Sequence, residues 1–213
     1  MGHPDERPVG RKVRVVKLGG SLLQRSDTQD RIQRWVQSLD TTDWIQVWVV
    51  GGGEWVELIR EFDRQHRLTA DQSHAASIAA MEVTARLVSG WFPEWQVVDS
   101  VQELTTTIER SGDNQRGRNS SERDPLTWNH LIWYPLASLS RGELDLPASW
   151  DVTSDSIAAW LAGRVNADEL VLLKSCHRES NQPLDWIQAG LVDRWFGQVC
   201  HGGFSIRWVN LTA

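Results

Sequence analysis

Three lysines stand in a chain that otherwise carries its positive charge on 19 arginines. One of them, Lys17, follows the strand-like run 13–16 and precedes the segment Leu18-Gly19-Gly20-Ser21. A lysine ammonium is a compact charge that suits phosphate oxygens, and glycines let backbone amides approach an anion closely. The segment 17–21 therefore predicts either a phosphate-binding loop or, taken alone, a tight turn after a strand.

A second glycine run, Gly51-Gly52-Gly53, ends another apolar stretch at 44–50. Alone, it is equally consistent with a simple strand-to-helix turn. Two glycine loops near the start of the chain, one of them beside a lysine, favour an anion held between adjacent strand ends with a helix N-terminus directed at it. Neither loop has the residue order of a Walker A sequence or of a GxGxxG dinucleotide fingerprint.

The segment Thr153-Ser154-Asp155 opens a predicted helix. Serine and aspartate are frequent at helix starts, so capping is one interpretation. The functional interpretation is that Asp155 holds Mg²⁺ or orients a lysine, while the hydroxyl groups of Thr153 and Ser154 contact phosphates.

Two further side chains are candidates, each with an ordinary alternative. Lys174 closes the apolar run 170–173, where its ammonium would either bind phosphate or lie in solvent. His74 would either line the substrate pocket or be a partly buried histidine of a helix. The cysteine-histidine pairs at 176–177 and 200–201 have a spacing that no zinc template shares.

The elements that must position these residues follow from hydrophobic periodicity. Strands are predicted at 13–18, 44–50, 96–98, 130–134, 169–174 and 204–209. Helices are predicted at 27–39, 54–66, 71–89, 101–110, 154–165 and 191–199. Alternating strands and helices indicate an α/β fold with a mostly parallel sheet covered on both faces. Ligands of such sheets bind beyond the carboxyl ends of the strands, so we expect the chemistry just after Leu18, Val50 and Leu173 and in the loop before the helix at 154.

Composition sets the remaining bounds. The 213 residues carry a net charge of −6, which argues against a nucleic-acid or anionic-membrane binder. Two cysteines, no signal-like segment and no long apolar stretch favour a cytoplasmic protein. We expect a flexible N-terminus at 1–12 and one domain at 13–213. Residues 111–124 contain no apolar side chain, which predicts a mobile surface loop or, alternatively, a lid over substrate.

In their order, these motifs resemble the amino-acid kinase family: VVKLGGS, then VVGGG, then WDVTSDSIAAWLA ahead of a VLLKS strand. Together with segments 71–74 and 80–82, these motifs are most similar to a small branch of that family, which includes the aminomethylfuran-methyl-phosphate kinase of methanofuran biosynthesis. The resemblance implies a three-layer α/β/α sandwich that uses ATP and Mg²⁺. It also implies an acceptor side at about 13–110 and a nucleotide side at about 125–213.

The resemblance also implies a role for each motif. Lys17 would neutralise the transferring phosphoryl group, with backbone donors from the glycine loops around it. Asp155 would orient the catalytic lysines, and Thr153 and Ser154 would face the nucleotide. The chain departs from the family at Lys174-Ser175-Cys176-His177, where a TDVDG-like segment is usual, and its late lysine-bearing segment is not evident. Lys174 is then the only candidate for the second positive charge, with Ser175 beside the nucleotide.

Three functional hypotheses follow. The first is an ATP-dependent kinase that phosphorylates the phosphate group of an aminomethylfuran-type cofactor precursor. The second is a kinase for the carboxylate of an amino-acid derivative, and the third is a nucleotide-binding sensor without catalysis. For each we expect a small-molecule ligand, a homo-oligomer, and neither a nucleic-acid nor a membrane partner.

Overall fold

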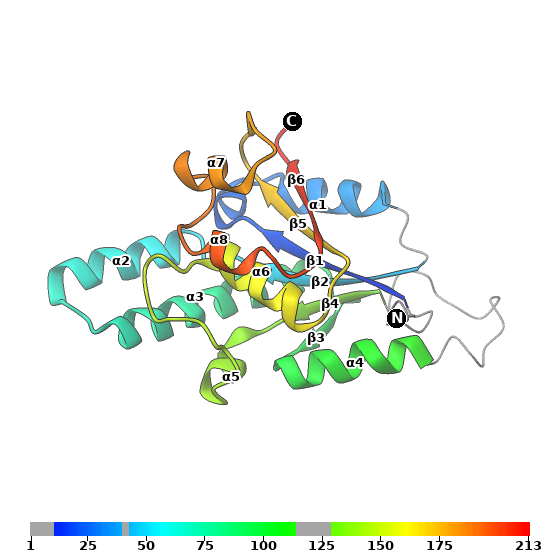
Figure 1. The fold of residues 1–213 in the computed structure, drawn as a ribbon, viewed down its shortest axis with the longest axis horizontal. Helices are drawn as coiled ribbons and strands as arrows, with labels where there is room; N and C mark the ends of the chain where they lie inside the picture. Colours follow the sequence, from blue (N-terminus) through cyan, green and yellow to red (C-terminus); the bar gives the residue numbers. More distant parts are fainter. Residues whose placement is uncertain (1–10, 40–42, 114–128) are drawn as a thin grey trace, which may run out of the picture.

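A computed structural model of the chain describes residues 11–39, 43–113 and 129–213. Its centre is a six-stranded sheet in the order β3-β4-β2-β1-β5-β6, with every neighbouring pair parallel (Figure 1). The strands are β1 (Lys12–Leu18), β2 (Trp44–Val50), β3 (Gln96–Val98), β4 (His130–Trp133), β5 (Glu169–Lys174) and β6 (Ser205–Asn210). The parallel α/β sheet expected from the sequence is confirmed.

The register of the central strands brings their carboxyl ends to one line. Leu18 of β1 pairs with Val50 of β2 on one side and with Leu173 of β5 on the other. The loops that follow these three strands therefore meet at the same edge of the sheet. The chain leaves β1 toward β2 and returns later to β5 on the opposite side, so the strand order switches direction at β1. Such a switch point is where ligands of doubly wound sheets bind.

Helices cover both faces of the sheet and make it the middle of three layers. The helices are α1 (Thr28–Gln37), α2 (Glu54–His66), α3 (Ala70–Trp91), α4 (Val101–Asp113), α5 (Pro135–Ser140), α6 (Ser154–Arg164), α7 (Pro183–Gln188) and α8 (Phe196–Val199). One buried cluster joins the sheet to α4, α6 and the first half of α3, and a second joins its other face to α1 and the second half of α3. Helix α2 and the start of α3 lie side by side beyond the carboxyl ends of the strands (Figure 1).

Tryptophan supplies much of the packing on both faces. In the second cluster the ring of Trp48 stacks on Trp95 with centroids 4.4 Å apart, and Trp95 stacks on His130 at 5.0 Å. The indole Nε1 of Trp48 donates a hydrogen bond to Nδ1 of His130, at 3.2 Å. His130 is thus a buried acceptor, and burial lowers its pKa to about 4.

The structure differs from the sequence prediction mainly in short elements. Helices α5 and α7 were not predicted, because six residues that begin with proline are too short to show a helical period. Of the helix expected at 191–199, the part that forms is α8. Lys12 is the first residue of β1 rather than part of the N-terminal segment, whose residues 1–10 lie outside the described ranges.

The predicted loop at 111–124 also begins too early. Helix α4 continues to Asp113, so its last turn includes the first three residues of that segment. Residues 114–128 lie outside the described ranges. Among the helices that the structure does describe, we find none with the length and apolar character needed to cross a membrane.

Candidate active site

One carboxylate joins two lysines at the carboxyl ends of adjacent strands. Lys17 Nζ lies 2.8 Å from Oδ1 of Asp155, and Lys174 Nζ lies 2.7 Å from Oδ2. Lys17 comes from β1, Lys174 from β5, and Asp155 from the first turn of α6. Lys174 Nζ also donates a 2.7 Å hydrogen bond to the carbonyl oxygen of Leu191. The structure therefore brings together the three residues that the sequence singled out as catalytic.

Burial makes the charges of this triad strongly interdependent. Lys17, Asp155 and Lys174 are 4%, 5% and 8% exposed. Burial alone would raise the pKa of Asp155, but the ammonium groups of Lys17 and Lys174 outweigh it and hold the pKa below its usual value. Burial and the nearby Lys17 charge lower the pKa of Lys174 to about 8, against the opposing effect of Asp155. An ionised carboxylate between two ammonium groups leaves one net positive charge at the site.

Asp193, which sequence reasoning missed, fixes the start of α6. Its Oδ2 accepts hydrogen bonds from the backbone amides of Thr153 and Ser156, both at 3.0 Å, and its Oδ1 accepts from the amide of Phe196 at 3.0 Å. One carboxylate thus caps α6 and orders the chain entering α8. Asp193 lies three residues before Phe196, which is the spacing of a helix-capping side chain. Helix α8 is too short to show a helical period in the sequence, so this capping role could not be predicted.

The hydroxyl groups of Thr153 and Ser154 differ in whether they are already hydrogen-bonded within the protein. Thr153 Oγ1 donates to Oδ2 of Asp193 at 2.7 Å, so this hydroxyl is engaged within the protein rather than free to contact a phosphate. Ser154 lines the cavity described below, and its Oγ lies against Gly51, where a Cβ on that glycine would come within 2.9 Å of it. Ser154 thus lies on the cavity wall, whereas the Thr153 hydroxyl is used at the start of α6.

The two glycine loops pack backbone against backbone. A Cβ on Gly20 would collide with the amide nitrogen of Gly53, and a Cβ on Gly51 would lie 2.9 Å from the nitrogen of Gly20. Gly53 has a φ of 58°, which is the left-handed region. These contacts explain why glycine occupies the loops even before any ligand is considered.

The amides of these loops separate into two groups. Gly19 donates to the carbonyl of Leu173 and Gly51 to that of Leu18, both at 2.9 Å. These two amides extend the strand pairing and are not available to an anion, which corrects their assignment as phosphate donors. The amides of Gly20, Gly52 and Gly53 donate to no other group in the described part of the chain, so these three suit a phosphate.

A cavity of about 270 Å³ opens between these loops and the helices α2, α3 and α6. Its lining includes most of the predicted site, namely Lys17, Gly20, Ser21, Gly51, Gly52, Gly53, His74, Thr153, Ser154 and Asp155. Gly19, Lys174 and Ser175 are not on its wall. His74 is half-buried there, and burial lowers its pKa against the opposing charge of Asp71. Residues that sequence reasoning did not select, including Arg60 and Trp150, complete the wall.

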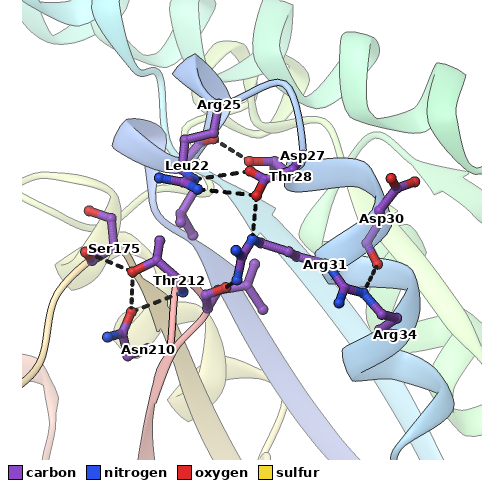
Figure 2. Close-up of polar contacts among 11 residues, drawn as sticks. Leu22, Arg25, Asp27, Thr28, Asp30, Arg31, Arg34, Ser175, Asn210 and Thr212 are labelled. Atoms are coloured by element: carbon purple, nitrogen blue, oxygen red, sulfur yellow. Dashed lines mark hydrogen bonds and ion pairs between the residues drawn. The ribbon is translucent and has the colours of Figure 1, made fainter.

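Ser175 belongs to a network that secures the end of β5. Its Oγ lies 3.0 Å from Oγ of Ser21. Its carbonyl accepts a hydrogen bond from Thr212 Oγ1 (Figure 2). The amide of Leu211 donates to the carbonyl of Lys174 at 2.9 Å, while Arg31 Nη1 donates to the carbonyl of Leu211 at 2.8 Å. Helix α1 and the end of β6 thereby hold the strand end that carries Lys174 (Figure 2).

The donor groups of the site fit phosphate better than they fit a protein-bound metal ion. Both oxygens of Asp155 are ion-paired with ammonium groups, so a metal ion bound there would have to share an oxygen with a lysine. Within residues 11–39, 43–113 and 129–213, no three histidine, cysteine, aspartate or glutamate side chains are grouped to hold a metal. The free amides of the glycine loops and the Lys17 ammonium are donors, which is the chemistry that phosphate oxygens require.

Comparison with known proteins agrees with this geometry. The sequence model of the amino acid kinase family matches residues 12–177, a range that includes Lys17, Asp155, Lys174 and both glycine loops. The fold is similar to that of UMP kinase from Ureaplasma parvum, with a TM-score of 0.62 at 12% identity over 95% of this chain and 91% of that one. Uridylate kinase from Archaeoglobus fulgidus gives 0.60 at 15% identity, over 93% and 90% of the two chains. Aspartate kinase from Synechocystis gives 0.61 at 14% identity, over 92% of this chain and 37% of that one. No curated protein sequence matches the chain.

Proposed function

Because the chain belongs to the amino acid kinase family, we propose that it transfers a phosphoryl group from ATP to a small-molecule acceptor. The observation that carries this proposal is the meeting of Lys17 and Lys174 on Asp155 beside a cavity between two glycine loops. Phosphoryl transfer requires little covalent chemistry from a protein. It requires alignment of donor and acceptor, and positive charge on the group that moves.

The chain's own residues supply that charge and alignment. An acceptor oxygen attacks the γ-phosphorus, the bond from phosphorus to the bridging oxygen breaks, and ADP leaves with the bonding electrons. Lys17, on the cavity wall, stabilises the charge on the transferring group, and the amides of Gly20, Gly52 and Gly53 bind its oxygens. Asp155 holds Lys17 in place, and Lys174 directs its charge at the site from the β5 side.

Mg²⁺ would neutralise part of the phosphate charge when ATP is bound. Because both Asp155 oxygens are paired with lysines, we propose that the ion is held mainly by the nucleotide's own phosphate oxygens. On this account Asp155 positions the two lysines and is not itself a magnesium ligand.

For the acceptor, we propose the phosphate group of an aminomethylfuran-type precursor, which rests on the sequence resemblance. The cavity wall contains the flat rings of Trp150 and His74, which would pack on an aromatic ring. Glu54 and Glu57 lie on the same wall and would attract a protonated amine. The carboxylate of an amino-acid derivative remains the second candidate for the acceptor group.

The test is ADP formation with ATP and a panel of phosphate monoesters, carboxylates and neutral alcohols. We expect release of ADP that depends on one class of acceptor and is lost in Lys17→Met. Tight ATP binding without turnover on any member of the panel would instead support the nucleotide-binding sensor. Failure to bind ATP at all would reject the proposed function.

A further inference from the structure

We infer that Arg60 binds an anionic group of the acceptor and sets the acceptor class of this enzyme. This inference rests on the proposed function. Arg60 lies on the cavity wall, and its Nε is buried without a hydrogen-bond partner among the described residues. Its Nε forms a long ion pair with Glu57, whose Oε2 is 3.8 Å away and thus beyond hydrogen-bond distance, and the two side chains are 38% and 71% exposed. A buried guanidinium nitrogen without a partner is costly, and an oxyanion in the cavity would supply the missing acceptor.

The guanidinium lies over the indole ring of Trp150. Its Cζ lies 4.5 Å from the centroid of the Trp150 ring, so one face of the group is covered by the indole. Stacking of this kind leaves the N–H donors of the guanidinium edge free in the plane, where they can bind two oxygens of a carboxylate or phosphate. The tryptophan therefore orders Arg60 before a ligand arrives, which reduces the entropy lost on binding.

The tryptophan is itself anchored by the same helix. Trp150 Nε1 donates a 2.6 Å hydrogen bond to Oδ2 of Asp63, which lies three residues after Arg60 on α2. Residues three apart are neighbours on a helix surface. Helix α2 therefore contacts the face of the Trp150 indole through Arg60 and its edge through Asp63. This hydrogen bond also holds the pKa of Asp63 below its usual value, which keeps the anchor ionised.

We assign the anion to the acceptor rather than to ATP because α2 lies within residues 13–110, which the family resemblance implies to be the acceptor side. Helix α2 begins directly after Gly53, and side chains on a helix tilt toward its N-terminus. Arg60 thus extends from the acceptor side back toward the glycine loop, on the same cavity wall as Lys17. The acid groups Glu54 and Glu57 share this wall but make no hydrogen bond to Arg60. An acceptor that is already an oxyanion, either a phosphate monoester or a carboxylate, fits this arrangement, and a neutral alcohol does not.

Calorimetric titration of inorganic phosphate and of acetate into the full chain tests this inference, with the nucleotide site saturated by a non-hydrolysable ATP analogue. We compare Arg60→Met with Arg64→Met as a matched control, because Arg64 lies one turn further along α2, is 72% exposed and pairs with Glu61. We expect at least tenfold weaker binding of one probe in Arg60→Met and wild-type binding in Arg64→Met. Loss of phosphate binding identifies a phosphate acceptor site, and loss of acetate binding identifies a carboxylate site. Unchanged binding of both probes in a folded Arg60→Met would overturn the inference.

Two further variants separate binding by Arg60 from a structural effect. Arg60→Lys keeps a positive charge but not the planar fork, so we expect it to restore less than half of the lost binding energy. Trp150→Phe keeps a ring and removes the Asp63 hydrogen bond, and it should raise KM for the acceptor with KM for ATP unchanged. Equal loss of ATP-analogue affinity and probe affinity in these variants would show a general disturbance and reject the assignment. Because the analogue is titrated separately, its failure to bind wild-type protein would reject the kinase proposal without bearing on Arg60.

Discussion

Lys17 Nζ lies 2.8 Å from Oδ1 of Asp155, although one residue belongs to the first strand and the other to the helix that precedes β5. The contact joins the part of the chain that the family resemblance implies to be the acceptor side to the part that it implies to be the nucleotide side. Since the carboxylate also holds Lys174, the geometry of both cations depends on a single aspartate. The first predictions concern this triad.

Asp155→Asn should cost both activity and stability. The amide keeps the shape of the side chain but leaves two buried ammonium groups without their counter-charge. Loss of one partner from a buried ion pair costs about 3–5 kcal/mol of unfolding free energy. Capping is performed by Asp193, so the loss of a cap does not account for such a value. Urea unfolding and kcat measured on the same preparation give the answer, and a stability loss below about 1 kcal/mol with normal kcat would contradict the expected role.

Lys17→Met should lower kcat by roughly a hundredfold or more, which corresponds to about 2.7 kcal/mol. The charge acts on the transferring group, so KM for ATP should change much less than kcat. Lys12→Met is the matched control, because Lys12 is an exposed lysine at the opposite end of the same strand. Steady-state kinetics on the two variants decide the matter, and a Lys17→Met enzyme within a few-fold of wild type would refute this assignment.

The rate should fall with rising pH as Lys174 loses its proton. Its pKa is about 8 because burial and Lys17 disfavour the ammonium, so the charge is present below pH 8 and is lost above it. We expect kcat/KM for ATP to decline above about pH 8 in the wild type. Lys174→Met should be at least tenfold slower and lack this alkaline decline, whereas Lys174→Arg should move the decline beyond pH 10 with partial activity. A wild-type rate and profile in Lys174→Met would place the charge outside the reaction.

Acid should weaken the fold through His130. Its pKa in the folded protein is about 4, whereas an unfolded chain has the ordinary value of 6.5, so the unfolded state binds a proton first as the pH falls. The free energy of unfolding that neutral His130 contributes is therefore fully present above pH 6.5. It decreases between pH 6.5 and 4, by up to about 3 kcal/mol. Denaturant unfolding at pH 7.5 and 4.5 should show this loss in wild type and a smaller loss in His130→Phe, which retains the stack on Trp95. Identical pH dependence in the two proteins would show that another group is responsible.

Gly20→Ala should separate the two glycine loops. A Cβ at this position meets the amide of Gly53, a backbone atom that cannot rotate away. Overpacking of this kind costs about 1–3 kcal/mol, and we expect turnover to fall with it. Gly163→Ala is the control, because a Cβ there meets nothing within 4 Å and lies inside α6, where alanine is favourable. Thermal melting of both variants should show opposite shifts, and a neutral Gly20→Ala would mean that the loops are not in contact.

The fold was predictable because its signals are local. The runs that became β1, β2 and β5 are mostly apolar and are buried on both faces, and each is followed by a break in the pattern. Parallel pairing then places their carboxyl ends together, so the neighbourhood of Lys17 and Lys174 followed from the sequence.

What the sequence could not provide depends on contacts between distant segments. The role of Asp193 exists only because α8 lies against the start of α6. The free and occupied amides of the glycine loops differ by hydrogen bonds to Leu18 and Leu173, which no composition reveals. Arg60 is an ordinary helix residue until Trp150 is brought onto it.

The parallel register also separates two groups of buried polar residues along the strands. Arg14 pairs with Gln46 and with Glu169, and Gln46 pairs with His130, so a buried polar row crosses the sheet three residues before Lys17. Three residues of a strand span about 10 Å, which separates this row from the lysines. A directed-evolution library for thermostability can therefore be confined to the amino-terminal edge of the sheet, which leaves the edge that carries Lys17 and Lys174 unchanged.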